Sequence, residues 1–516
     1  MSSSGPDTEL AYPDCTFHTE VLPCESHSSV SFQEAGPSRY TANAEPYTKA
    51  KPVISSPVTR NSLDKAASHL RASQLVAFPS ETVYGLGANA LSQSAASKIY
   101  AAKKRPADNP LIVHVSDLEM LDTLLPQSYT MSQAYSDLIK AFWPGALTLL
   151  FPVDTQRPAV PTVVTCGHPS VAVRMPSHPI ARALIAISGL PMAGPSANAS
   201  GRPSPTTAGH VLRDLGGQLD AESSSADASQ APKGRLRYIL DGGACQVGVE
   251  STVIDGITAA DEVRVLRPGG VTVEQIASVL DKAGLANKVK LRVYGKDMER
   301  SVEQESNPTT PGMKYRHYSP TARVVLLLPA NLFARAAQSS GSNNTSGSRS
   351  QPDSSSSTKV VETLLNVESN LSIAPRSFAD IVRDQITNHL SSAQPRSTLH
   401  IGLMISCDSA LSRLVTTASH ATDAPTSDMH PHLLRPLALE QLENVRVHPF
   451  DLGPSGSAEV YAQRMFDGLR TLDEGPLHGA DRCDLIFVEA MDDAGVGLAV
   501  MNRLKKAASA TVVLDC

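Results

Sequence analysis

The chain has 516 residues, and its 45 Lys and Arg against 51 Asp and Glu give a net charge of -6. This length allows two or three domains, and the slight excess of acid argues against a protein coated with nucleic acid. The seven cysteines form no CxxC pair and no zinc spacing, which favours a reducing compartment.

The first 55 residues are rich in Ser, Pro and Glu and show no sustained hydrophobic period. Such a segment buries too little apolar surface to offset its ordering entropy, so residues 1–55 are predicted to be a disordered tail. They also lack the apolar core of a secretory signal, and their acids are atypical of a mitochondrial presequence. No apolar run approaches the roughly 18 residues of a membrane span. These features predict a cytoplasmic protein with no membrane contact and leave an organellar copy open.

Residues 56–295 are predicted to form one α/β domain. Helical patterns such as LDKAASHLRAS alternate there with short apolar strands such as LVAFP, ALTLLFPV and YILD. The low-complexity segment 218–234 interrupts this domain, and its composition predicts an exposed loop insertion without a chemical role.

Residues 296–320 are predicted to be a connector, although PGMKYRHYSP at its end is richer in aromatic and basic groups than a flexible spacer. Strands such as ARVVLLLP then alternate with helical patterns such as VMNRLKKAA, which predicts a smaller Rossmann-like α/β domain over 321–516. Within it, the Ser-, Asn- and Gly-rich segment 337–358 is predicted to be disordered. GVGLAV at 495–500 lacks the third glycine of a dinucleotide loop, which favours tight helix packing there.

Two polar stretches could together hold phosphate, although the chain has no GxxxxGK[ST] loop. If KKRPADNPLIVHV at 103–115 is extended, Lys103 and Arg105 project from one face. Ser196 and Asn198 in PSANASGRPSPT share a face in the same way. An ammonium, a guanidinium, a hydroxyl and a carboxamide can bind phosphate oxygens, but composition alone favours plain solvated turns.

Four further polar residues interrupt short apolar strands: His114, Arg174, Ser251 and Arg267. A single histidine at a strand end is more often a satisfied core residue than a ligand, and a single arginine there is usually a surface pairing. Several such residues in one domain are harder to explain in this way, because buried charge is costly unless it is paired or faces a ligand.

These stretches occur in an order that resembles the YrdC-like family of threonylcarbamoyl-AMP synthases. The matching segments are PSETVYGLG, KKRPADNPLIVHV, WPGALTLLF, SVAVRMPSHP, GPSANASGRPSPT, GVESTVID and LRPGG. The connector and the later domain resemble the longer, two-domain branch of the family. The resemblance is strong over about residues 60–330 and looser over 380–516.

The resemblance implies a YrdC-like twisted sheet with a concave basic cleft, followed by the Rossmann-like domain. It implies an L-threonylcarbamoyladenylate synthase, a nucleotidyltransferase that consumes ATP, bicarbonate and L-threonine and releases pyrophosphate. Mg²⁺ would arrive with the nucleotide, without metal ligands from protein side chains. The product would pass to a separate tRNA threonylcarbamoyl transferase complex that modifies adenosine beside the anticodon, and a weak contact with tRNA is compatible with this role.

The resemblance also assigns residues to roles. The catalytic tetrad would be Lys103, Arg105, Ser196 and Asn198. ATP would contact Arg105, Asn109, Ser170, Ser196, Ser204 and Arg267. L-Threonine would contact Thr82, His114, Arg174, Gly194 and Ser251. Tyr315 and Tyr318 would form a lid over the site.

Two other classes of protein share part of this pattern. A hydrogenase-maturation carbamoyltransferase also contains a YrdC-like domain, but its N-terminus is rich in cysteine, whereas this one has only Cys15 and Cys24. A non-enzymatic RNA-binding module could use the same basic cleft, and it would bind tRNA in a salt-sensitive way without releasing pyrophosphate. The net acidity and the complete tetrad count against it.

Overall fold

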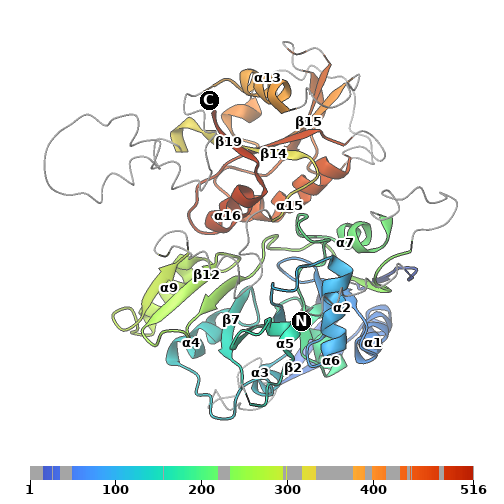
Figure 1. Ribbon diagram of the computed structural model, residues 1–516, viewed down its shortest axis with the longest axis vertical. Helices are drawn as coiled ribbons and strands as arrows, with labels where there is room; N and C mark the ends of the chain where they lie inside the picture. Colours follow the sequence, from blue (N-terminus) through green and yellow to red (C-terminus); the bar gives the residue numbers. More distant parts are fainter. Residues whose placement is uncertain are drawn as a thin grey trace, which may run out of the picture. The chain divides into compact units, whose positions relative to one another are not determined.

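The computed structural model (Figure 1) divides into two compact units, Met1–Lys314 and Tyr315–Cys516. This division falls inside the predicted connector. The structure describes residues 16–25, 27–34, 49–154, 156–218, 233–294, 298, 317–332, 376–389, 398–413, 430–438, 442, 444–475 and 482–514. Both units combine helices with β-sheets, so the predicted α/β class is confirmed.

The first unit is built on an eleven-stranded mixed sheet. The sheet contains both parallel and antiparallel strand pairs. The spatial order of its strands differs widely from their order in the chain. In spatial order the strands are β1 (Glu20–Pro23), β10 (Tyr238–Asp241), β4 (Val76–Phe78), β5 (Gly85–Asn89), β9 (Met192–Ala193), β6 (Ile112–His114), β8 (Ser170–Arg174), β7 (Leu147–Pro152), β11 (Thr252–Asp255), β12 (Glu262–Arg267) and β13 (Lys290–Val293).

Helix α1 (Pro57–Arg71) shows how the sequence fixes the helices of this unit. Ser56 caps it by accepting a hydrogen bond from the Thr59 amide at 3.1 Å, and Pro57 occupies its first position. Its buried residues pack with α6 (Pro179–Ser188) in a core that includes Phe78. The other helices described in this unit are η1 (His27–Ser29), α2 (Gln93–Lys103), α3 (Leu118–Asp122), α4 (Gln133–Phe142), α5 (Thr162–Thr165), α7 (Ala208–Leu215) and α9 (Val273–Lys282).

The prediction of a disordered tail over 1–55 is wrong for the part of it that the structure describes. β1 extends the large sheet in parallel with β10, and Leu22 within it is 2% exposed. β2 (Val30–Glu34) and β3 (Ala50–Ile54) pair as an antiparallel hairpin. An existing sheet edge offers partners to backbone N–H and C=O groups, and local composition cannot reveal such an edge. Residues 1–15, 26 and 35–48 lie outside the described ranges.

The two ends of the low-complexity insertion lie next to each other in space. The amide of Arg235 donates to Leu215 O at 2.8 Å, and a Cβ on Gly217 would lie 2.3 Å from Lys233 O. Residues 219–232 between these positions lie outside the described ranges. Deleting 219–232 is therefore expected to change the unfolding free energy by less than about 0.5 kcal/mol, and any activity by less than about twofold. Denaturant unfolding followed by the fluorescence of Trp143, the one tryptophan of the chain, measures the first effect. A larger loss of stability would show that the insertion packs on the domain.

The second unit contains a six-stranded sheet in which only β16 is antiparallel. Its strands, in spatial order, are β16 (Leu437–Ala438), β17 (Val445–Asp451), β15 (Leu399–Ile405), β18 (Leu485–Glu489), β14 (Arg323–Pro329) and β19 (Ala510–Leu514). The named helices are α13 (Phe378–His389), α15 (Ala458–Glu474) and α16 (Gly497–Ala507). This parallel arrangement agrees with the predicted Rossmann-like class. The segment 337–358 lies outside the described ranges.

Tight packing explains the glycine at the start of α16. A Cβ on Gly497 would lie 2.1 Å from the carbonyl oxygen of Asp492, so no larger residue fits without a backbone shift. This agrees with the packing interpretation of GVGLAV. None of the helices in the described ranges combines the length and apolarity that a membrane crossing requires.

Candidate functional site

Lys103 and Arg105 flank a reversal of the chain, so the prediction of a straight extended segment is wrong. Lys103 is the last residue of α2, and Lys104 caps this helix in the left-handed conformation with φ 52°. The amide of Arg105 then donates to Tyr100 O at 2.9 Å. The turn nevertheless buries both Lys103 and Arg105 and leaves Lys104 exposed.

Lys103 holds the loop that carries Ser196 and Asn198. Its Nζ donates to the backbone oxygen of Ser196, to that of Asn198 at 2.5 Å and to Asn198 Oδ1 at 3.3 Å. Asn198 Nδ2 donates to the carbonyl oxygens of Ala199 and Arg202 at 2.8 and 2.9 Å. The structure therefore joins three of the four predicted tetrad residues, and it does so mainly through the loop backbone.

Arg105, the fourth member of the tetrad, braces the turn that follows it. Its Nε donates to Asn109 O at 3.1 Å and its Nη2 to Pro110 O at 3.0 Å. Asn109 is 4% exposed, and no group in the described ranges forms a hydrogen bond with its Oδ1. Leaving such an acceptor unsatisfied is costly, so this oxygen is suited to receive a donor from a ligand.

Arg174 is the centre of a second buried cluster. Its guanidinium donates to Gly145 O at 3.1 Å, to Thr82 Oγ1 at 2.8 Å and to Glu81 Oε1 at 2.5 Å. Burial is the largest single effect and opposes ionisation of Glu81, but the charge and hydrogen bond of Arg174, together with the backbone amides of Glu81 and Ser177, lower the pKa of the carboxyl. A guanidinium has five N–H donors, so two of them have no partner among the described residues.

His114 lies beside Arg174, because the two residues are register partners on the parallel strands β6 and β8. Burial, followed by the Arg174 charge, lowers the pKa of His114 from 6.5 to about 3, so the imidazole is neutral near pH 7. Its Nδ1 has no hydrogen-bond partner within the described part of the chain. A Cβ on Gly194 would lie 3.3 Å from this nitrogen and 3.2 Å from the Phe78 ring, so glycine keeps the space beside His114 open.

The cluster continues across β7 and β11. Thr148 is the register partner of Arg174 on the other side, and its hydroxyl lies 2.7 Å from that of Ser251. Arg267 Nη2 donates to Ser251 O at 2.8 Å and to its hydroxyl at 3.2 Å. The predicted threonine residues therefore form one continuous buried group, to which one predicted ATP residue, Arg267, is bonded.

Two other predicted nucleotide residues, Ser204 and Ser170, form no side-chain hydrogen bond to this group within the described ranges. Ser204 is fully buried and donates to Glu250 Oε1 at 2.7 Å. Ser170 begins β8 and is half-buried, and no side-chain hydrogen bond within the described ranges joins it to the cluster. Their assignment to ATP stays a prediction.

Sequence reasoning missed three buried polar residues of these clusters: Glu81, Thr148 and Glu250. Glu81 and Glu250 stand inside the segments PSETVYGLG and GVESTVID, where an acid among small and apolar residues was the available signal. Thr148 gives no signal, because a threonine is common in any strand.

The lid residues are only partly described. Tyr315 lies outside the described ranges. Tyr318 is 4% exposed and packs inside the second unit, with its ring centroid 5.3 Å from that of Phe466 and 5.9 Å from Arg503 Cζ. Its proposed role over the active site therefore stays a prediction.

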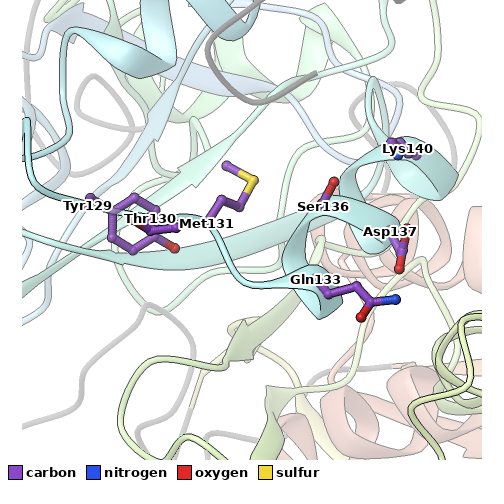
Figure 2. A pocket seen from close by; sticks show the side chains of 7 residues that line it. All are labelled: Tyr129, Thr130, Met131, Gln133, Ser136, Asp137 and Lys140. Carbon is purple, nitrogen blue, oxygen red and sulfur yellow. The ribbon is translucent and has the colours of Figure 1, made fainter. Parts of the chain in front are cut away.

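An open groove of about 650 Å³ lies elsewhere on the first unit (Figure 2). It is lined by α4 and the segment before it, through Tyr129, Thr130, Met131, Gln133, Ser136, Asp137 and Lys140. None of the predicted site residues lines it. In the described ranges, no three His, Cys, Asp or Glu side chains are grouped as metal ligands.

Because of two buried histidines, the free energy of unfolding should decrease as the pH falls. Burial lowers the pKa of His114 to about 3 and that of His178 to about 4, both from 6.5. The unfolded chain therefore binds protons below pH 6.5 that the folded chain excludes until about pH 4. Each histidine should add about 1.4 kcal/mol of destabilisation per pH unit in that window. Unfolding followed by Trp143 fluorescence between pH 7 and 5 measures the slope, and His178→Gln should reduce it; an unchanged slope would contradict the prediction.

Comparisons with known proteins cover both units. A family model described as "Telomere recombination" matches residues 68–269, and one described as "Threonylcarbamoyl-AMP synthase, C-terminal domain" matches residues 271–509. The threonylcarbamoyl-AMP synthase of Schizosaccharomyces pombe is 46% identical over 301 residues, which are 55% of this chain and 68% of the relative. That of Bacillus subtilis is 34% identical over 450 residues, 87% of this chain and 93% of the relative. The crystal structure of P. abyssi Sua5 complexed with L-threonine is 33% identical with a TM-score of 0.55, and the match covers 87% of this chain and 96% of that one.

Proposed function

The chain belongs to the threonylcarbamoyl-AMP synthase family, and we infer from this premise that it makes L-threonylcarbamoyladenylate from ATP, bicarbonate and L-threonine. Pyrophosphate is the second product, which places the enzyme among the nucleotidyltransferases. The product serves the formation of threonylcarbamoyladenosine in tRNA. The observation that carries this proposal is the buried cluster around Arg174, whose two remaining donors suit the carboxylate of an amino acid.

The cluster around Arg174 would bind L-threonine. Arg174 would pair with the carboxylate, while Thr82 holds the guanidinium in place from one side. The neutral His114 has an acceptor at Nδ1 that is suited to the threonine hydroxyl. Gly194 would leave room for the substrate methyl group beside this imidazole, and Ser251 would close the other end of the site.

The tetrad would bind ATP around the transferred phosphorus. Arg105 would neutralise charge that develops on the α-phosphate, and Asn109 Oδ1 would accept a donor from the nucleotide. Lys103 already gives its Nζ donors to the Ser196 and Asn198 loop, so we assign it mainly to positioning that loop. Ser170, Ser204 and Arg267 complete the proposed nucleotide contacts.

The proposed reaction has two bond-forming steps. The free amine of threonine attacks the carbon of carbon dioxide with loss of a proton, or that of bicarbonate with loss of water, and gives a carbamate. A carbamate oxygen then attacks the α-phosphorus of ATP, and the bond to pyrophosphate breaks. The protein's part is to hold the reactants in line and to stabilise the growing charge. Mg²⁺ would come with the nucleotide, since this ion keeps most of its waters and binds phosphate oxygens readily.

The connector and the partners belong to the same proposal. The connector with Tyr315 and Tyr318 would close over the bound nucleotide and keep water from the labile adenylate. The product would then pass to a separate tRNA threonylcarbamoyl transferase complex, with at most a weak contact between this chain and tRNA.

The deciding experiment measures pyrophosphate release from ATP by the full-length protein. Release should depend on both L-threonine and bicarbonate, and the adenylate should be recovered in equal amount. Salt-sensitive tRNA binding without any release of pyrophosphate would instead identify a non-enzymatic RNA-binding module.

A further inference from the structure

Glu81 has an unused acceptor in the middle of the Arg174 cluster. Its side chain is 6% exposed, and Oε1 accepts a hydrogen bond from Arg174. The backbone amides of Glu81 and Ser177 lie close enough to the carboxyl to help lower its pKa, but Oε2 is buried and receives no hydrogen bond of normal geometry within the described ranges. An ionised carboxylate accepts several hydrogen bonds, and a buried oxygen without any is costly. Half of this carboxylate therefore lacks the donor that burial normally requires.

The neighbouring hydroxyl groups cannot supply that donor. Ser80 Oγ donates its proton to Val83 O at 2.6 Å and lies 2.8 Å from Thr82 Oγ1. Since Thr82 Oγ1 already accepts from Arg174, its own proton is directed to Ser80. The two hydroxyls beside Glu81 in the sequence are thus engaged with each other and with the backbone.

We propose that Glu81 Oε2 binds the α-ammonium group of L-threonine while Arg174 binds its carboxylate. This inference rests on the proposed function and adds a substrate-binding residue to it. In an α-amino acid one carbon separates the ammonium from the carboxylate, and in the protein one hydrogen bond separates Glu81 from Arg174. The zwitterion can therefore lie along the protein ion pair with each charge facing its opposite.

This arrangement has a consequence for the reaction. The nitrogen that must form the carbamate would be held at one position by a charged group that is itself fixed by Arg174, and the ammonium must lose one proton before its lone pair can attack. Burial strengthens the contact, because both charges are removed from water. A ligand without the amine would leave Oε2 unsatisfied, so the site would discriminate against it.

The test compares L-threonine with (R)-3-hydroxybutanoate, which keeps the carboxylate and the hydroxyl and lacks only the amine. Dissociation constants are measured by calorimetry for the unchanged protein and for Glu81→Gln. The unchanged protein should bind threonine roughly 10- to 100-fold more tightly than the analogue, as a charge-assisted hydrogen bond predicts. In Glu81→Gln that ratio should fall to within about threefold, mostly through weaker threonine binding.

Thr82→Val is the matched control, because it removes the other side-chain contact of Arg174 and leaves the carboxylate of Glu81 in place. It should weaken both ligands by the same factor and preserve their ratio. If Glu81→Gln also preserves the ratio, Glu81 only positions Arg174 and the inference is wrong. Glu81→Asp keeps the charge, but its side chain is shorter. If the glutamine variant does not fold, the ratio of the two dissociation constants is measured in Glu81→Asp instead. Threonine-dependent pyrophosphate release by the unchanged protein tests the proposed function separately.

Discussion

Replacing Arg105 with alanine is expected to reduce the rate of pyrophosphate release by roughly 10²- to 10³-fold, the usual cost of losing one preorganised charge-stabilising donor. The side chain is 8% exposed and donates to Asn109 O and Pro110 O, so the variant also loses two hydrogen bonds that shape the turn. We expect a loss of about 1–3 kcal/mol in the free energy of unfolding from this second effect. Steady-state kinetics at saturating ATP and Trp143 fluorescence measure the two effects separately.

Lys104→Asn is the matched control for Arg105→Ala. It removes a neighbouring positive charge from an exposed position, and asparagine tolerates the left-handed conformation that Lys104 adopts. Its rate should stay within about twofold of the unchanged protein. If Arg105→Ala keeps at least half of the rate, the tetrad assignment is wrong. If both variants lose rate to the same extent, general electrostatics accounts for the loss and the assignment is again wrong.

The tetrad shows what the sequence could predict and what it could not. The order of the motif segments identifies the family, and in the structure Lys103 donates hydrogen bonds to Ser196 and Asn198. The geometry at residues 103–105 was predicted wrongly, because a lysine in a left-handed helix cap has no distinctive sequence signal. The identities of the motif residues therefore predicted the site better than the expected backbone conformation did.

The cluster of polar strand residues around Arg174 could not be predicted from the sequence, because it depends on which strands are neighbours in the sheet. His114, Arg174 and Thr148 lie on three adjacent strands because β6 and β7 both pair with β8. A single sequence indicates that each residue interrupts a strand, but it does not show which strands are neighbours. The order of the eleven strands also explains why β1 was missed, since its partner β10 lies more than 200 residues later in the chain.

Replacing Arg174 with alanine is expected to destabilise the first unit by about 3–5 kcal/mol, because it leaves the buried Glu81 carboxylate without its partner. Both side chains of the pair are about 5% exposed, so water cannot replace the lost contact. Threonine-dependent activity should be lost as well. Trp143 lies in the same unit and is 3% exposed, so its fluorescence during denaturant unfolding reports the stability of that unit.

The double variant Arg174→Met with Glu81→Leu separates stability from binding. Apolar residues of similar volume remove both charges together, and such replacements of a buried pair are often neutral or stabilising. Stability should therefore return to within about 1 kcal/mol of the unchanged protein. Threonine binding should not return, because neither the fork for the carboxylate nor Glu81 is present. A double variant as unstable as Arg174→Ala would mean that Thr82 and Gly145, the other partners of the guanidinium, matter more to the fold than the ion pair. Recovery of both stability and threonine binding would remove Arg174 from the amino-acid site.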